Sequence, residues 1–318
     1  MDNLTHSLVG ALLGQAGLKR KTGLAMPALV IGANLPDVDA ACFFWLEGQE
    51  HFGFRRGITH GPPALVLLPL ILAGLLWAFD RWQAKRGTRP EGRLPVRFTW
   101  LFLLSFIGCL THPAMDWLNV YGIRLLEPFS SQWFYGDTLF IIDVWLWGLM
   151  GFATWLSLRR ERRGGDWMRP TRIAIALSLT YIGLNWAVTT WQHVLGGKSR
   201  EPYPVEFIAA PVPFSFWERE QIALLPDGRW LSSTWNGTDF GYGYRRSENP
   251  QCAMPELSEA RRLNSELDVF LFWSRAPFAE RAEDGSVILR DARFYDPRAR
   301  DRFSVPLPEV ECVELPNE

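Results

Sequence analysis

Apolar residues are gathered into blocks over the first two thirds of the chain. Six segments can be delimited, at residues 4–18, 23–46, 61–79, 98–118, 138–158 and 173–192. The third contains no charged residue and is long enough to cross a bilayer as a helix. The first two are weaker, because one is short and the other carries polar residues in its second half, so a re-entrant path fits them as well as a full span. The pattern predicts a polytopic α-helical membrane bundle over residues 1–195.

The last third of the chain follows another pattern. Residues 199–318 are punctuated by Pro and Gly, and their apolar runs are short and rich in strand-forming residues. These runs lie at 203–209, 229–235, 268–273, 286–290 and 302–306. The pairs Asp227-Gly228 and Asp284-Gly285 fit hairpin turns. The predicted fold class is therefore mainly α, a membrane bundle followed by a small β-rich domain over 199–318.

Basic residues predict the orientation of the bundle. Lys and Arg concentrate in the loops 19–21, 80–97 and 159–172, whereas 119–137 holds a single Arg. Short basic loops stay in the cytoplasm, so we expect these three inside, and 119–137 and the C-terminal domain outside. The N-terminus lacks the basic region and cleavage site of a secretory signal, so the membrane segments are expected to direct insertion. We predict a multi-pass protein of a bacterial-type inner (plasma) membrane, in contact with the lipid bilayer.

Composition adds three points to this picture. Many of the 16 Trp lie in or beside apolar runs, as expected of residues that anchor helices at the membrane interface. The net charge of −1 gives no reason to expect nucleic-acid binding. Cys252 and Cys312 are the only cysteines of the C-terminal domain; a disulfide fits an extracytoplasmic location, and two separate thiols fit equally well. Nothing in the composition indicates an oligomeric state.

Ionisable residues inside the apolar segments are the candidate chemistry. His112 and Asp116 are four residues apart, on one face of a predicted helix, at the end of an apolar run. Such residues are costly in a membrane and usually have a partner or a function. The predicted orientation brings other ionisable residues to the same outer side of the membrane: His6, Asp37, Asp39, His60 and Asp143.

These residue types favour a metal site. Imidazole nitrogens and carboxylate oxygens suit zinc, or iron and manganese, and coordination compensates for the burial of carboxylates. For any single histidine a hydrogen-bonded packing role is the alternative, and we expect that role for His51 and His193. Asp143 fits either a structural role, as a helix N-cap or as a partner for a buried arginine, or a functional role. Three histidines, each preceded by Thr, together with two or three aspartates on one side favour the metal.

Five motifs carry a resemblance to a known family. They are Met1-Asp2-Asn3-Leu4-Thr5-His6, Asn34-Leu35-Pro36-Asp37-Val38-Asp39, Arg56-Gly57-Ile58-Thr59-His60, His112-Pro113-Ala114-Met115-Asp116 and Gly136-Asp137-Thr138-Leu139-Phe140-Ile141-Ile142-Asp143. In this order they resemble the membrane-bound metal-dependent hydrolases of YdjM type, over most of residues 1–150. Arg290-Asp291-Ala292-Arg293-Phe294 resembles the tail of longer members. That family is in turn similar to the zinc-dependent phospholipase C and P1-type nuclease superfamily.

The resemblance implies roles for individual residues. Asp37, His60, His112 and Asp116 match the ligands of one metal ion. His6 matches a ligand of a second ion, with Asp116 bridging the two. The family often has His where this chain has Arg55, and the further His and Glu that a third ion needs are not found downstream. One or two divalent ions are therefore expected, with zinc favoured and iron or manganese as alternatives.

A metal with an open coordination position would activate water for hydrolysis. Asp39 and Asp143 are the candidate general bases, and Arg55 and Arg56 the candidates for holding an anionic group, a solvated pair being the alternative for the arginines. The expected activity is hydrolysis of an ester or phosphoester at the outer membrane surface, with a lipid headgroup as candidate substrate. The alternatives are a membrane protein whose metal is structural or transported, and a family member that keeps the fold without turnover.

Overall fold

The computed structural model describes residues 1–196, 203–235, 250–256, 258, 264 and 266–315. The chain divides into two compact units. The first comprises Met1–Ala40 and Arg56–Asn185, and the second comprises Ala41–Arg55 and Trp186–Glu318. The short segment Ala41–Arg55 therefore folds with the C-terminal unit, although both of its flanks belong to the helical one.

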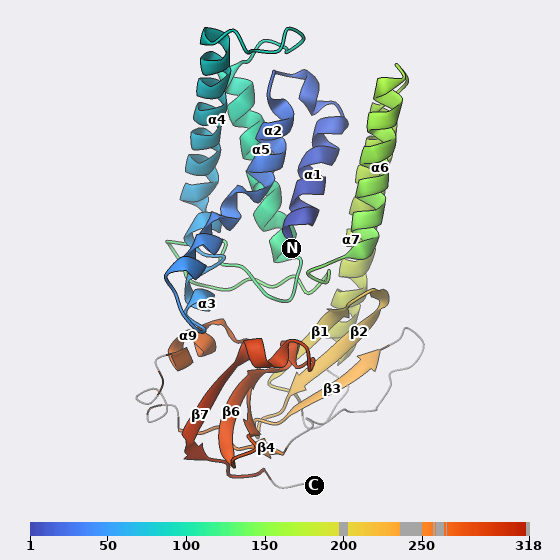
Figure 1. The fold of residues 1–318 in the computed structure, drawn as a ribbon. Coiled ribbons are helices and arrows are strands. Elements are labelled where there is room, and N and C mark those ends of the chain that lie inside the picture. Colours follow the sequence, from blue (N-terminus) through green and yellow to red (C-terminus); the bar gives the residue numbers. More distant parts are fainter. Residues whose placement is uncertain (197–202, 236–249, 257, 259–263, 265, 316–318) are drawn as a thin grey trace. The chain divides into compact units, whose positions relative to one another are not determined.

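The first unit is helical and contains most of the predicted membrane segments, two of which, 23–46 and 173–192, end in the second unit (Figure 1). Its longer helices are α1 (Asn3–Gln15), α2 (Ala25–Asn34), α4 (Pro62–Lys85), α5 (Phe98–Trp117), α6 (Val144–Arg162) and α7 (Met168–Gly196), the last of which continues into the second unit. Short helices connect them: η1 (Leu18–Arg20), η2 (Leu35–Phe44) and η3 (Ile58–His60), with α3 (His51–Phe54) lying in the segment assigned to the second unit.

In the described part of the chain, four helical stretches are long and apolar enough to cross a membrane. They are Ala25–Phe44, Pro62–Lys85, Phe98–Trp117 and Met168–Val194. The remaining two predicted segments form α1 and α6. Helix α1 has 13 residues, about 20 Å, which is short of a bilayer. Helix α6 starts at Val144 rather than at residue 138, and its last turn is basic.

Helices α2 and α5 approach each other closely because glycines line their contact. A Cβ on Gly108 would lie 2.6 Å from the Leu29 carbonyl oxygen, and one on Gly32 would lie 2.7 Å from that of Ser105. Leu29 and Leu104 are fully buried in the core that α2, α4 and α5 share. This contact fixes the last turn of α2 against the middle of α5, one turn before His112.

A change of helix type ends α2. The stretch Ala25–Phe44 is an α-helix to Asn34 and a 3-10 helix over Leu35–Phe44. Pro36 contributes to the change, because it lacks the N–H that an α-helix would use at this position, whereas Leu35 before it keeps α dihedral angles of φ −65° and ψ −35°. Asp37 and Asp39 therefore lie on a tighter helix than the rest of the segment.

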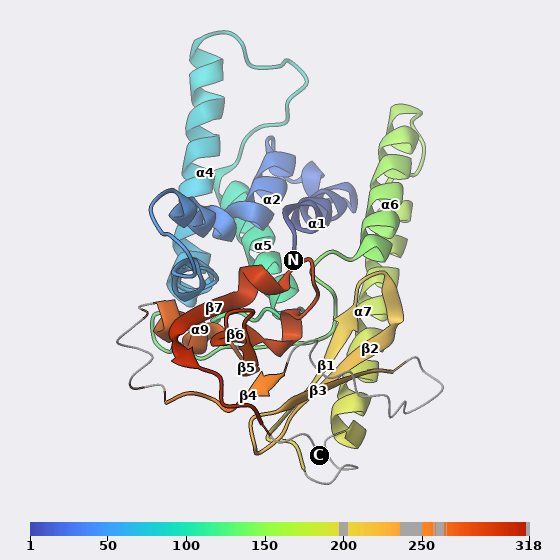
Figure 2. The same cartoon turned by 60° about the horizontal axis from the view of Figure 1, so that its bottom comes forward.

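The second unit contains two antiparallel sheets (Figures 1 and 2). One has the order β1 (Glu206–Val212), β2 (Ser215–Leu224), β3 (Trp230–Trp235), and the other β4 (Gln251–Cys252), β5 (Pro277–Arg281), β6 (Ser286–Asp291), β7 (Ser304–Glu311). The mainly α fold with a small β-rich C-terminal domain is thus confirmed. Both predicted Asp-Gly turns are present, with Gly228 and Gly285 at φ of 85° and 87°.

Two details of this unit bear on the predictions made from the sequence. One contradicts a predicted strand, and the other decides between two alternatives for a pair of cysteines. The sequence predicts a strand at 268–273. This prediction is wrong, because the run belongs to the helix α9 (Glu266–Trp273). Leu267, Phe270 and Trp273 are buried at intervals of three residues, as on one face of a helix. The composition of this short run favours a strand, so the helical spacing was not recognised in the sequence. Cys252 and Cys312 form a disulfide, so the pairing alternative holds.

Candidate metal centre

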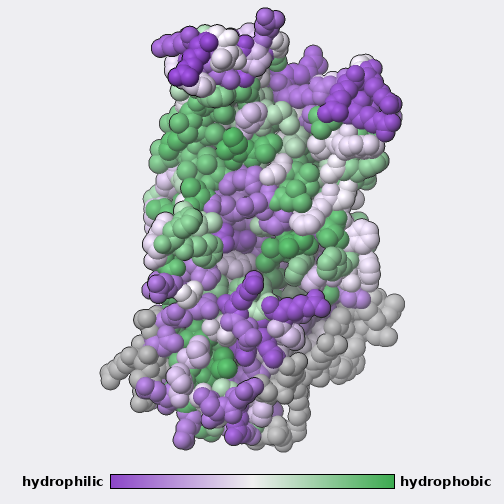
Figure 3. Space-filling view, in the orientation of Figure 1, coloured by the Kyte–Doolittle hydropathy of each residue, from purple (hydrophilic) through white to green (hydrophobic). Residues whose placement is uncertain are grey.

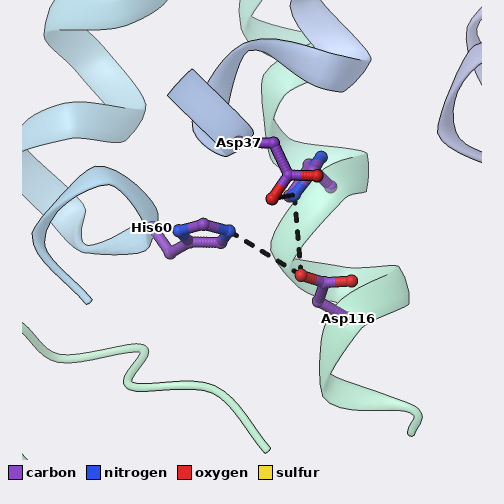
Figure 4. Close-up of side chains that lie close together, drawn as sticks. Asp37, His60 and Asp116 are labelled. Carbon is purple, nitrogen blue, oxygen red and sulfur yellow. Dashed lines mark ion pairs between the residues drawn. The ribbon is translucent and has the colours of Figure 1, made fainter. Parts of the chain in front are cut away.

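Three separate segments bring four candidate ligands together in the first unit. Asp37 comes from η2, His60 ends η3, and Asp116 lies on α5 (Figure 4). His112 lies on α5 as well, one turn before Asp116. One ligand atom from each of the four lies within 4.8 Å of those of the others. The cluster therefore joins residues 37, 60, 112 and 116, as the sequence predicts.

Asp116 and His112 are at the centre of the cluster. His112 Nε2 lies 3.5 Å from Asp116 Oδ2 and 3.7 Å from Asp37 Oδ1. His60 Nε2 lies 3.7 Å from Asp116 Oδ2. These separations exceed hydrogen-bonding distance and suit donor atoms that share a cation between them.

The orientation of His112 is fixed from behind. Its Nδ1 lies 2.7 Å from the carbonyl oxygen of Ala33, at the end of α2. A carbonyl oxygen only accepts hydrogen bonds, so Nδ1 carries the proton and Nε2 presents its lone pair to the cluster. Nε2 is buried and makes no hydrogen bond with any described residue. This is the arrangement of a metal-binding histidine with its outer hydrogen bond in place.

His60 is held by a short chain of polar side chains. Its Nδ1 lies 2.9 Å from Thr59 Oγ1, and Thr59 donates to Asp39 Oδ2 at 3.1 Å. The same carboxylate oxygen accepts from the backbone N–H of Arg56 at 2.8 Å and lies 3.6 Å from His60 Nδ1. Asp39 therefore stands behind His60 in the way a carboxylate stands behind a ligand histidine in metal sites.

Asp116 is also paired with positive charge. The Arg56 guanidinium spans both of its oxygens, with Nε 3.2 Å from Oδ2 and an Nη 3.4 Å from Oδ1. The amino group of Met1 contacts Oδ1 as well. Because the carboxylate is almost fully buried, these pairs offset a desolvation cost that an isolated Asp116 would carry.

His6, from α1, completes the inner surface. Its ring stacks on that of His112 with centroids 3.8 Å apart, and its Nε2 lies 3.4 Å from Asp116 Oδ1. Neither of its buried nitrogens makes a hydrogen bond with a described residue. His6 lies outside the group of four that share one set of distances, so a second ion bound through it stays a prediction.

The residues present fit a bound divalent ion. Two imidazoles and two carboxylates converge, the buried Nε2 of His112 points into the cluster without a hydrogen bond to any described residue, and a hydrogen bond from outside holds that ring. Asp37 gives the cluster its contact with the surface: its side chain is 12 % exposed, whereas those of the other three are at most 1 % exposed.

Comparison with known proteins places the chain. The model of the family described as YdjM inner membrane protein matches residues 1–192, which include all four clustered residues. The chain belongs to the YdjM family. It is also 26 % identical over 254 residues to the uncharacterized protein YfhP of Bacillus subtilis (strain 168), covering 67 % of this chain and 73 % of that protein. No solved structure matches the chain.

Membership in this inner-membrane family agrees with the four apolar spans, so the chain is a membrane protein. In this YdjM family member, Arg56 is buried beside the cluster. It is therefore not the solvated arginine that was the alternative to a role in binding an anionic group. Arg55 lies in the segment assigned to the second unit, where its guanidinium lies 5.4 Å from the centre of the Phe43 ring. Its predicted role in substrate binding stays a prediction.

Asp143 is the N-cap of α6, one of its predicted roles. Its Oδ1 accepts from the N–H groups of Trp145 and Leu146, at 3.1 and 2.9 Å. Its Oδ2 accepts from the hydroxyl of Tyr181 at 2.9 Å. Both oxygens are thus engaged in structural contacts, and the predicted role of Asp143 as a general base stays a prediction, as it does for Asp39.

Two residues near the cluster were not predicted. Asn119 is fully buried, and its Oδ1 accepts from Arg56 Nη at 3.1 Å and from the N–H of Tyr121 at 2.9 Å. The Tyr121 ring lies 4.5 Å from the Arg56 guanidinium carbon. The only signal available was the position of both residues just after the ligand helix α5, which is too weak to assign a role.

Proposed function

We propose that this YdjM family member is a membrane-bound metal-dependent hydrolase that acts on an ester or phosphoester carried by an amphiphilic molecule. The supporting observation is the convergence of Asp37, His60, His112 and Asp116 around one point, with the bare Nε2 of the buried His112 directed into it. The similarity to zinc-dependent phospholipase C and P1-type nucleases, proposed from the sequence motifs, favours a phosphoester.

In this proposal the four clustered residues hold the ion, with zinc favoured and iron or manganese as alternatives. When bound, such an ion polarises a phosphoryl or carbonyl oxygen and lowers the pKa of water. Asp39, which lies behind His60 and not in the cluster, holds this ring in place through Thr59, and its role as general base stays a prediction from the sequence. Arg56 orients an anionic group of the substrate while remaining beside Asp116.

The surroundings of the cluster support an amphiphilic substrate. Exposed apolar side chains lie within three residues of site residues along the chain: Leu4, Val38 and Ile58, each between 49 % and 53 % exposed. On the face shown in Figure 3, hydrophilic surface interrupts the apolar surface of the helical unit around the end of α2. A polar opening with apolar surroundings suits a headgroup that enters while its chains stay in lipid.

Metal content and turnover test the proposal together. Purified full-length protein is analysed for bound metal, and hydrolysis is measured on mixed micelles of phosphatidylglycerol and phosphatidylethanolamine by release of phosphate or headgroup. We expect one or two equivalents of metal, lost with turnover in His112→Ala and Asp116→Asn. His193→Ala is the matched control, because that half-buried histidine packs edge-on against Phe207 in the second unit. Equal metal content in His112→Ala and wild type would refute the site.

The second candidate is a membrane protein whose metal is structural or transported. The burial of three of the four ligands favours it, because structural sites are closed to solvent. It predicts bound metal without turnover, together with either a fall in thermal stability on chelation or metal flux in proteoliposomes. Turnover that depends on His60 would exclude it.

A further inference from the structure

A groove between α6 and α7 is separate from the metal centre. It has a volume of about 300 Å³, and its walls are mostly apolar, including Phe152, Leu156, Ile173 and Leu177. Arg160 and Arg169 lie among its lining residues, near the ends of the two helices that the basic loop connects. The groove therefore combines a lipid-like lining with two guanidinium groups at one end.

These two arginines differ from three other basic residues at the same end of the helical unit. Arg89 and Arg93 are paired with Asp80, and Lys19 is paired with Glu161. In the described part of the chain, by contrast, no acidic side chain forms an ion pair with Arg160 or Arg169, and both are exposed. The groove thus has a positive end that is not neutralised from within.

The position of the groove relative to the bilayer follows from α7, one of the four candidate spans, whose first turn holds Arg169; α6, which lines the groove with it, is not one of the four. Asp143 caps the N-terminus of α6, and Arg160 lies in its last turn. A helix of 19 residues is about 28 Å long, close to the thickness of the hydrocarbon core. The arginines are therefore placed at headgroup level on the side predicted to be cytoplasmic, with the apolar walls extending into the hydrocarbon.

We propose that this groove binds one phospholipid with an anionic headgroup, such as phosphatidylglycerol. An acyl chain lies along the wall formed by Phe152, Leu156, Ile173 and Leu177, and the phosphate is held by Arg160 and Arg169. Guanidinium groups suit phosphate in charge and geometry, and basic pockets between membrane helices are known to bind anionic headgroups. The alternative role of these arginines is to orient the protein in the membrane. That role depends on their charge alone and does not require an apolar groove beside them.

Lipid titration of the purified full-length protein tests this proposal. Binding of phosphatidylglycerol and of phosphatidylcholine is measured by native mass spectrometry in a mild detergent. We expect saturable binding of one phosphatidylglycerol and no such step for phosphatidylcholine. The double variant Arg160→Gln/Arg169→Gln should bind phosphatidylglycerol roughly thirtyfold more weakly, from about 1 kcal/mol for each arginine.

Two further variants separate charge from shape. Arg81→Gln/Arg86→Gln removes the same charge near the end of α4, where the two arginines lie over Trp77 and Trp82, and should bind phosphatidylglycerol as the wild type does. Ile173→Trp, at a half-exposed lining position, should fill the groove and weaken binding with both arginines in place. Equal loss in the two double variants, or no loss in Arg160→Gln/Arg169→Gln, would overturn the proposal. So would displacement of the lipid by glycerol 3-phosphate, which would indicate a site for free phosphate. None of these outcomes depends on metal content or hydrolysis.

Discussion

Phe52 stacks on Trp273, with ring centroids 4.3 Å apart and ring planes 14° from parallel. Phe52 lies in the segment Ala41–Arg55, which folds with the C-terminal unit. Gln49, in the same segment, donates to the carbonyl oxygens of Arg302 and Ser304. The two flanks of the segment carry Asp37 and His60, so the C-terminal unit holds the piece of chain that joins two of the candidate ligands.

Loss of this stacking should lower the affinity of the candidate metal centre for its ion. Phe52→Ala removes a side chain that is 1 % exposed, so we expect a loss of about 3–5 kcal/mol in the stability of the C-terminal unit. The segment then loses its anchor, and metal affinity should fall although no ligand is changed. Thermal unfolding and metal titration measure the two effects. Phe44→Ala, at a position 91 % exposed, is the control, and a metal affinity unchanged in Phe52→Ala would separate the segment from the site.

A pair of glycines tests how helix packing sets the site. Gly108→Ala would place a methyl group 2.6 Å from the Leu29 carbonyl oxygen and 3.0 Å from the Ala33 nitrogen, so α2 must move away from α5. The Ala33 carbonyl then leaves His112 Nδ1, and metal affinity should fall at least tenfold.

Gly148→Ala is the matched control in α6. Nothing lies within 4 Å of a Cβ at Gly148, so this change should leave metal affinity as it is and stabilise the helix by up to about 1 kcal/mol. Metal titration and thermal unfolding of both variants make the comparison. Equal metal affinity in Gly108→Ala and Gly148→Ala would show that close packing of α2 and α5 does not position His112.

Much of this architecture was predictable, for physical reasons that differ between regions. Long apolar runs and basic loops predict helices and their ends, and the spacing of His112 and Asp116 on one helix face predicts that both reach one site. The hydrogen bond of His112 to Ala33 was not predictable, because a backbone carbonyl carries no mark in the sequence. The placement of Phe52 on Trp273 was equally hidden, since it depends on tertiary contacts between distant segments. The helix α9 was not predicted because its residues have a high propensity for strands. What favours the helix is the burial of one of its faces, which depends on tertiary packing.

Thr59 should affect metal binding without being a ligand. Its hydroxyl links His60 Nδ1 to Asp39 Oδ2, so Thr59→Val removes the support of a ligand ring at nearly constant volume. We expect metal affinity to fall about 10- to 100-fold, as for other changes behind ligand histidines. Thr59→Ser keeps the hydroxyl and should restore most of the affinity. If serine and valine behave alike in metal titration, the hydroxyl has no such role.

Asp143 allows its two predicted roles to be separated. Asp143→Ala should lower the free energy of unfolding by about 1 kcal/mol through loss of the N-cap of α6. The loss should be larger still because the contact with Tyr181 is removed as well. Asp143→Asn keeps an oxygen for the cap but cannot accept a proton as a base. Because both carboxylate oxygens are engaged in structural contacts, we expect Asp143→Asn to retain metal, stability and any turnover. Loss of turnover alone in Asp143→Asn would assign Asp143 to catalysis.

Asp291 should make the C-terminal unit sensitive to acid. The carboxylate is buried, and its oxygens accept from the Arg293 guanidinium at 2.7 and 2.8 Å and from Ser274 at 2.6 Å. Burial by itself raises the pKa of Asp291, but the charge of Arg293 and these hydrogen bonds outweigh it and hold the pKa below its ordinary value of 3.8.

A lowered pKa in the folded protein means that the ionised carboxylate stabilises it at every pH above the ordinary value. That stabilisation should persist at neutral pH and be lost as the pH falls below 3.8 and through the folded pKa. Hydrogen exchange of peptides from β5 and β6, measured from neutral pH down to well below 3.8, follows the change locally. Asp291→Asn leaves Arg293 buried without its carboxylate, and we expect it to cost about 3–5 kcal/mol at pH 7. Because the variant lacks the titrating group, its exchange should show less of the acid-dependent loss than the wild type. An equal acid response in both would assign the sensitivity to other carboxylates.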